Sequence, residues 1–381
     1  MKKSCFSILS LIICLPLWAQ QVETVYIHPQ LIDGMVVDSE GYIYTTPGAF
    51  NGQMTVGRAT PDGTYEPDFF DGFHGPADID QNAQGVFFVT NYDDNTLKSY
   101  DPFFDEVNTL ASGLDGPAGV ALDQDGNSFV SCYGTPSTFD GNQIIRVDAT
   151  GTVEVWLESS LLFRPQGMTF DNQGNLWVTN TASGEIFKID TTTKIPELIY
   201  QIGPQAGSLA FREKDGLLYF ASQGNNQIYR MDLVGNMELF AGTGTQGTLD
   251  GEALSAQFKS PFGLAFSPTE DTLYVSGGGN LRRIINLDGT PSSLPNPGLS
   301  SRLVVSPNPF QNQILVRLTM PSTAPITLSI YNVEGKLVTQ KTFQVNTPMV
   351  LDQLNILPPG KYFLQASING KQLVSTALLK T

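Results

Sequence analysis

Cysteine and histidine are scarce in this chain, which has three cysteines and two histidines among 381 residues. Cys5 and Cys14 fall in a short apolar segment at the N-terminus, so Cys132 is the only cysteine in the rest of the chain. A single thiol cannot form an intrachain disulfide, and we expect it to be a small buried apolar residue. No Cys and His cluster offers a zinc site, and His28 and His74 accompany no G-x-S-x-G motif, so nucleophilic catalysis has little support.

Basic residues are few in the first three quarters of the chain. Of 21 basic and 37 acidic residues, seven basic ones but only Glu334 and Asp352 fall in residues 302–381, which leaves the segment from residue 21 with a net charge of −23. Phosphate binding needs clustered Lys and Arg, so nucleic acid is not expected as a partner. Divalent cations, cationic partners and simple solubility outside the cell all agree with this acidity.

A membrane-spanning apolar run is also missing. The apolar run Phe6 to Leu17 falls short of the about 20 residues that a transmembrane helix needs. It follows two lysines and precedes the small residue Ala19, which predicts a signal peptide over residues 1–20. We therefore expect export, with no transmembrane anchor in the mature chain.

A repeated pattern accounts for most of the sequence. Its clearest copy, residues 165–190, has an apolar strand, a tight Asp-Asn-Gln-Gly turn, a second apolar strand and an alternating third strand that ends in an aspartate. The closing aspartates, spaced by 47, 42, 42 and 56 residues, are Asp101, Asp148, Asp190, Asp232 and Asp288. Six units start near Leu31, His74, Asp115, Phe163, Pro204 and Ser260. A period in the forties without helices predicts an all-β, six-bladed β-propeller over residues 21–290.

The ends of this region complement each other. Residues 22–28 form a lone strand without a repeat, and the sixth unit stops after its third strand near Leu287. We predict that the N-terminal strand becomes the outer strand of the last blade and closes the ring.

These units resemble the NHL repeat, most specifically over Phe240–Phe266. The resemblance covers residues 22–290 and implies a six-bladed propeller, a shape shared with SMP-30/gluconolactonase enzymes and with many proteins that only bind. Two other motifs are discounted. The G-x-G-x-x-G at residues 242–247 has no following helix pattern, and Asp123–Asn127 mimics a calcium loop where every blade has a hairpin turn.

The family comparison also points to a site at the mouth of the central channel. The residues just before the glycine of each innermost strand are expected there, namely Asp33, Asp78, Ala118, Gln166, Ala206 and Phe262. SMP-30-like lactonases hold calcium through a Glu, an Asn and an Asp; Asp33 matches the aspartate, Gln166 replaces the asparagine, and the early Glu is absent. Asp33 and Asp78 are candidate ligands for Ca²⁺. The preferred interpretation is simpler, namely that they are hydrated residues at the channel mouth or caps on backbone amides.

Further polar candidates follow the second strands of the blades. Asn91, Asn180, Gln223 and Tyr133 either add polar contacts at the channel mouth or belong to turns.

The C-terminal part has a different pattern. Residues 291–301 are rich in Pro and Ser and predict a linker. Short alternating strands separated by turns then predict a small β-sandwich over residues 302–381. This segment closely resembles the C-terminal sorting domain of type IX secretion, with matching residues that include Pro307, Asn308, Pro309, Gly335, Gly360 and Tyr362. The resemblance implies a Gram-negative bacterium, passage through the periplasm, recognition by the type IX secretion machinery, and release or attachment at the cell surface.

Two functions remain open from the sequence. The first is a non-catalytic extracellular propeller that binds a sugar, a peptide or a surface partner. The alternative is a calcium-dependent lactonase or related hydrolase that uses the channel mouth. The first is preferred, because the calcium ligand set has one good match, Asp33, and one near miss, Gln166.

Overall fold

A computed structural model describes residues 20–49, 52–61, 63–288, 303–306, 310–318, 325–332, 336–344, 349–368 and 371–380. The chain divides into two compact units, residues 1–292 and 293–381. The predicted signal peptide (except residue 20) and the linker at 291–301 lie outside the described residues. Within the described residues, no helix has the length and apolar character needed to cross a membrane.

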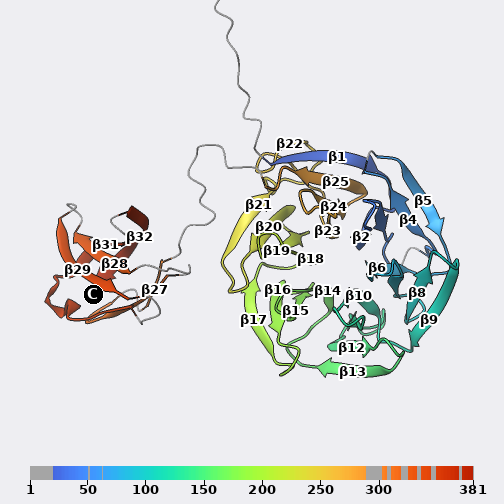
Figure 1. The fold of residues 1–381 in the computed structure, drawn as a ribbon, viewed down its shortest axis with the longest axis horizontal. Coiled ribbons are helices and arrows are strands. Elements are labelled where there is room, and N and C mark those ends of the chain that lie inside the picture. Colours follow the sequence, from blue (N-terminus) through green and yellow to red (C-terminus); the bar gives the residue numbers. More distant parts are fainter. Residues whose placement is uncertain are drawn as a thin grey trace, which may run out of the picture. The chain divides into compact units, whose positions relative to one another are not determined.

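The first unit is a ring of six antiparallel sheets, which we number as blades 1–6 (Figure 1). Blade 1 consists of β2 (Met35–Val37), β3 (Ile43–Thr45), β4 (Val56–Ala59) and β5 (Tyr65–Phe70). Blade 2 consists of β6 (Pro76–Gln81), β7 (Phe87–Asn91), β8 (Thr96–Asp101) and β9 (Glu106–Ser112). Blade 3 consists of β10 (Pro117–Leu122), β11 (Ser128–Cys132), β12 (Gln143–Val147) and β13 (Val153–Glu158).

The remaining blades continue in chain order around the ring. Blade 4 consists of β14 (Pro165–Phe170), β15 (Leu176–Asn180), β16 (Glu185–Ile189) and β17 (Pro196–Gln201), and blade 5 of β18 (Ala206–Arg212), β19 (Leu217–Ser222), β20 (Gln227–Met231) and β21 (Met237–Ala241). Blade 6 contains β23 (Leu264–Phe266), β24 (Leu273–Gly277), β25 (Asn280–Ile285), β1 (Gln21–Ile27) and β22 (Gly251–Glu252). The six-bladed propeller predicted from the repeats is confirmed.

The N-terminal strand closes the ring, as predicted. β1 pairs antiparallel with β25, from Gln21 opposite Ile285 to Ile27 opposite Asn280. The structure adds a strand that the repeat pattern does not reveal: β22, in the insertion between blades 5 and 6, pairs with the other edge of β1. Blade 6 therefore has five strands, and its closing strand is paired on both sides.

The hairpin turns explain why the repeats carry Asp and Gly at fixed offsets. In blade 4, Asp171 Oδ1 accepts the backbone N–H groups of Gln173 and Asn175, both at 2.9 Å. Gly174 then takes a φ of 79°, a conformation that glycine adopts without steric cost. In blade 3, Asp123 Oδ1 accepts the N–H groups of Asp125 and Asn127 in the same way, which confirms the predicted hairpin turn.

Neighbouring blades are joined close to the channel. A hydroxyl near the end of a second strand donates to a carbonyl of the next innermost strand, as Ser131 Oγ does to Gln166 at 3.0 Å. Equivalent bonds run from Thr46 to Ala77, Thr90 to Ala118, Thr179 to Gly207 and Ser276 to Asp33. A Cβ on Gly119 would lie 1.8 Å from the Gln166 carbonyl oxygen, so close approach of the strands requires glycine there.

The apolar core lies between the blades. One buried cluster combines Phe129, Ile144 and Trp156 of blade 3 with Met168 and Val178 of blade 4. Each interface therefore buries side chains from two repeats, which is why no single unit is expected to be stable alone.

The C-terminal unit consists of two sheets, and the predicted β-sandwich is confirmed. One sheet contains β26 (Leu303–Ser306), β27 (Ile314–Leu318) and β30 (Met349–Leu351), and the other contains β29 (Leu337–Phe343), β28 (Ile326–Asn332), β31 (Gly360–Ile368) and β32 (Lys371–Lys380), with a 3-10 turn at Leu354–Ile356. A single buried cluster includes residues of both sheets, such as Ile314 and Leu328. Of the predicted sorting residues, Gly360 begins β31 and the buried Tyr362 donates its hydroxyl to the Pro358 carbonyl at 2.8 Å, whereas Pro307, Asn308, Pro309 and Gly335 lie outside the described residues.

Candidate functional site

A cavity of about 480 Å³ opens at one end of the propeller channel. We call it the mouth pocket. It is formed by segments that precede innermost strands or follow second strands, and its lining residues are Ile32, Asp33, Tyr133, Arg164, Gln166, Thr181, Ala182, Pro204, Gln205, Gln223 and Phe262. Blades 1, 3, 4, 5 and 6 all contribute. The pocket thus contains four of the seven site residues proposed from the sequence, namely Asp33, Gln166, Tyr133 and Gln223.

Among the described residues, Asp33 is the only acidic one that lines this pocket. Its Oδ1 accepts a long hydrogen bond from Gln166 Nε2 at 3.4 Å, and Gln166 Oε1 accepts from Thr181 Oγ1 at 3.1 Å. Burial, followed by the nearby Asp78 carboxylate, raises the pKa of Asp33 well above its usual value. Loss of water and a second negative charge both disfavour ionisation. The pocket therefore favours a protonated Asp33.

Asp78 lies in a different register from the one assumed from the repeat. Asp78 pairs with Thr90, and its backbone N–H donates to the Thr90 hydroxyl. In blade 3, Gly119 pairs with Ser131 and donates to the Ser131 hydroxyl in the same way. Asp78 thus occupies the glycine position itself, one residue beyond the mouth-facing position. This corrects the alignment, and it explains why Asp78 does not line the mouth pocket.

The Asp78 carboxylate instead connects two innermost strands. Its two oxygens accept the N–H groups of Ile79 at 3.0 Å and Val120 at 3.1 Å. Asp80, two residues further along β6, repeats this arrangement and accepts the N–H of Leu122 at 2.9 Å. Burial raises the pKa of Asp78 to about 7 and that of Asp80 to about 6. These carboxylates cap backbone amides between blades 2 and 3.

Asn91 and Asn180 occupy equivalent positions at the ends of β7 and β15, and both are fully buried. Asn91 Oδ1 accepts the N–H of His74 at 3.1 Å, and Asn180 Oδ1 accepts that of Phe163 at 3.0 Å. Their side-chain amides donate to backbone carbonyls in turn. Both residues hold the segment that enters their blade, and neither lines the mouth pocket.

Arg164 is a pocket residue that the sequence reasoning missed. It precedes β14 with a φ of 54°, and its Nε donates to the Phe139 carbonyl at 2.6 Å. Its guanidinium lies 5.0 to 5.9 Å from the ring centres of Phe163, Phe139 and Tyr133, within cation–π range. Repeat analysis treated this position as a blade entrance; no local motif marks it as a binding group.

The calcium hypothesis requires several oxygen ligands around one point. Within the described part of the chain, no group of three or more Asp, Glu, His or Cys side chains is arranged to hold a metal ion. Both Asp78 oxygens accept backbone N–H groups, and Gln166 turns its amide nitrogen toward Asp33. Asp33, Asp78 and Gln166 therefore do not fit the ligand set that the lactonase resemblance implies.

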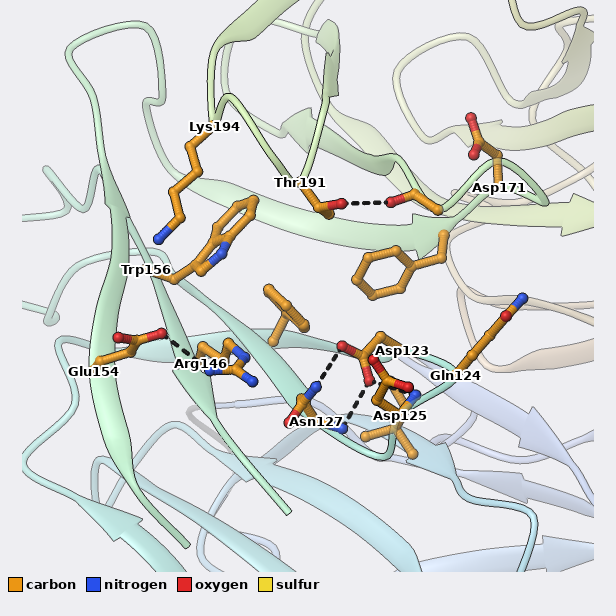
Figure 2. Close-up of a pocket in the computed structure, with 14 residues that line it drawn as sticks. Asp123, Gln124, Asp125, Asn127, Arg146, Glu154, Trp156, Asp171, Thr191 and Lys194 are labelled. Carbon is orange, nitrogen blue, oxygen red and sulfur yellow. Dashed lines mark hydrogen bonds and ion pairs between the residues drawn. The ribbon is translucent and has the colours of Figure 1, made fainter. Parts of the chain in front are cut away.

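A second cavity, also of about 480 Å³, lies between blades 3 and 4 at the end where the innermost strands turn back, opposite the mouth pocket. Figure 2 shows Lys194 beside Trp156, the ion pair of Arg146 with Glu154, and Asp125 at the hairpin turn. Lys194 Nζ lies 5.4 Å from the Trp156 ring centre, and Arg146 Nη1 lies 3.2 Å from Glu154 Oε1. We call this cavity the turn-side groove.

The polar groups of the turn-side groove are mostly engaged within the protein. Asp123 accepts from the Asn127 side chain at 2.6 Å, and Asp171 accepts from Trp177 Nε1 at 2.9 Å. Trp156 is only 6% exposed. Asp123 and Asp171 are therefore engaged in holding the hairpin turns of their blades.

Comparisons with known proteins agree with this division of the chain. Residues 304–380 match the secretion system C-terminal sorting domain, and residues 130–282 match a repeat of unknown function. A search of curated proteins finds no match. The C-terminal unit is therefore a type IX sorting domain, which supports secretion and a location at the cell surface.

Solved structures resemble the propeller. An auxiliary nutrient binding protein from Bacteroides ovatus is 15% identical with a TM-score of 0.58, covering 70% of this chain and 76% of that one. A gluconolactonase from Xanthomonas campestris is 15% identical with a TM-score of 0.56, covering 70% and 89%. A protein of unknown function from Bacteroides thetaiotaomicron is 14% identical with a TM-score of 0.58, covering 70% and 76%. At these identities the likeness concerns the fold alone.

Proposed function

We propose that this chain is an exported β-propeller that binds a small extracellular ligand in the mouth pocket, without catalysis, and that the type IX machinery recognises its C-terminal unit. The observation that carries the proposal is the mouth pocket itself, which brings together Asp33, Gln166, Tyr133 and Gln223 from four blades. Its volume of about 480 Å³ falls within the range of small-molecule sites.

The chemistry of the pocket supports binding. Tyr133, Phe262 and Ile32 supply apolar surface, while the glutamine side chains supply both donors and acceptors. Seven of the eleven described residues that line the pocket carry polar groups, and several placed polar groups are what a site uses to fix the orientation of a ligand.

The lactonase alternative has weaker support. A calcium-dependent hydrolase needs an ion to polarise the lactone carbonyl and activate water. Asp33 is the one residue whose sequence motif matches a lactonase ligand, and Asp78 points its carboxylate to Val120 in the next blade. No structural observation favours this activity over binding.

Saturation-transfer NMR with the chain from residue 20 to 381 tests the proposal, using short peptides and mono- and disaccharides as probes. We expect a subset to bind, and we expect Gln223→Ala and Tyr133→Ala to weaken that binding at least tenfold without changing the melting temperature. Asp125→Ala, in the turn-side groove, is the matched control and should bind normally. Binding that survives both pocket variants but is lost in the control would move the site to the groove and refute the proposal.

Calcium provides a separate check. Ca²⁺ at millimolar concentration should leave the melting temperature unchanged, and a lactone panel should show no hydrolysis. A calcium-dependent rise in stability together with lactone turnover, both removed by Asp33→Ala, would establish the alternative instead.

A further inference from the structure

Arg164 is exceptional among the arginines of the propeller. Residues 20–288 contain seven arginines, and six of them form ion pairs with carboxylates: Arg58, Arg146, Arg212, Arg230, Arg282 and Arg283. Among the described residues, Arg164 has no carboxylate within ion-pair distance. In a segment with a net charge of −23, an arginine that lacks an acidic partner is unexpected. It calls for a partner that is not part of the chain.

The Arg164 side chain is also held in place before any ligand arrives. Its Nε donates to the Phe139 carbonyl at 2.6 Å, and three aromatic rings surround the guanidinium. No described residue accepts a hydrogen bond from Nη1 or Nη2, which leaves those donors for the pocket. A guanidinium presents its N–H groups in a planar fork that matches the two oxygens of a carboxylate. Little further ordering is needed when such a group binds, which favours affinity.

The rest of the pocket suggests what is attached to that carboxylate. The side-chain amides of Gln205 and Gln223 form no hydrogen bond within the described part of the chain, and each offers a donor and an acceptor, as a peptide group requires. Ile32 and Phe262 provide an apolar wall, and Phe163 beside Arg164 is 43% exposed. None of the described residues that line the pocket is a tryptophan; its aromatic rings are Tyr133, which faces Arg164 at 5.9 Å, and Phe262, which is 4% exposed. Apolar side chains and peptide amides fit this lining better than an all-polar sugar does.

We infer that the mouth pocket binds the C-terminus of a short peptide, with the terminal carboxylate on Arg164, backbone amides on Gln205 and Gln223, and an apolar last side chain against Ile32 and Phe262. This inference rests on the proposed function and specifies its ligand. Asp33 does not oppose it, because burial favours its protonated, uncharged form.

The test compares peptides that differ only at the C-terminal group. Gly-Gly-Leu and Gly-Gly-Phe with a free carboxylate, and the same peptides as C-terminal amides, are titrated calorimetrically into the chain from residue 20 to 381. We expect the free acids to bind at least tenfold more tightly than the amides. Arg164→Gln should reduce the free acids to the level of the amides, and Arg164→Lys should retain part of the preference because it keeps the charge but loses the fork.

Two controls keep the test decisive if Arg164 also supports the fold. Melting temperatures of the Arg164 variants are measured alongside, and Gln205→Ala should weaken acids and amides equally, since it removes an amide contact but not the carboxylate contact. If the free acids and the amides bind equally and Gln223→Ala abolishes the binding of both, the inference is overturned but the proposed function stands. Binding of glucuronic acid but of no peptide would overturn the peptide assignment. Absence of any Gln223-dependent binding among peptides and sugars would refute both.

Discussion

The paired carboxylates between blades 2 and 3 predict that the propeller loses stability as pH rises from 5 to 8. Asp78 and Asp80 each cap backbone N–H groups of β10, yet burial raises their pKa values to about 7 and about 6. A carboxyl whose pKa is higher in the folded state binds a proton more tightly there than in the unfolded chain. Its stabilising contribution is complete below the unfolded pKa, near 4, and is lost as pH rises through the folded pKa.

The size of the effect follows from these shifts. One pKa unit corresponds to about 1.4 kcal/mol. Above pH 5 the effect extends over about two pKa units for Asp78 and about one for Asp80, so the expected loss of stability between pH 5 and pH 8 is about 4 kcal/mol. The pKa of Asp33 is also raised, so its ionisation lowers the stability in the same direction. For a domain of this size, 1 kcal/mol shifts the melting temperature by about 2 °C, so a fall of about 8 °C between pH 5 and pH 8 is expected.

The assay is urea unfolding of the chain from residue 20 to 381, followed by the fluorescence of the buried Trp156 and Trp177. Asp78→Asn keeps one acceptor oxygen but no longer titrates, so its unfolding midpoint should change less between pH 5 and 8 than that of the natural chain. Asp125→Asn, an exposed turn residue, should keep the full dependence. Stability that is constant or rises from pH 5 to 8, or an unchanged slope in Asp78→Asn, would refute this account.

Three further predictions concern closure, the free thiol and export. Deleting residues 21–28 removes the strand that pairs with both β22 and β25. At about 1 kcal/mol net per lost backbone hydrogen bond, the melting temperature should fall by about 10 °C in a single transition. An unchanged transition would contradict closure by β1. Cys132 is buried, and burial raises its pKa to about 12. In a chain without residues 1–19, this thiol should therefore resist Ellman's reagent at pH 8 until denaturant is added. Prompt labelling of the folded protein would contradict its burial. Deleting residues 302–381 should leave a folded propeller in the periplasm, and undiminished appearance outside the cell would show that the sorting domain is dispensable.

The fold could be predicted from the sequence because its local and long-range signals agree. The Asp and Gly of each hairpin sit at fixed offsets, and the repeat period sets the number of blades. Even the closing strand follows from counting, since residues 22–28 lack a repeat and the sixth unit lacks a strand. β22 could not be predicted in this way, because a two-residue strand inside an insertion has no period.

The candidate site was only partly predictable, because it depends on which residues face the channel. Repeat alignment identified Asp33 and Gln166, but it misplaced Asp78 by one residue, and in a strand a shift by one residue reverses the direction of the side chain. The register became clear only from the pairing of Asp78 with Thr90. Asn91 and Asn180 have side chains that could bind a ligand. In the structure, however, their buried amides bind the backbone of the segments that enter their blades.

Arg164 shows a different limit of sequence reasoning. Nothing in its neighbourhood in the sequence separates it from the other arginines, since what distinguishes it is the absence of an acidic partner among the described residues. That property depends on the position of every carboxylate in the folded propeller, and several of the other arginines are paired with residues more than 30 positions away, as Arg282 is with Asp250 and Arg283 with Glu23. A binding group of this kind therefore becomes visible only after the internal ion pairs have been assigned. The loss of carboxylate preference in Arg164→Gln is accordingly the sharpest test of function for this pocket.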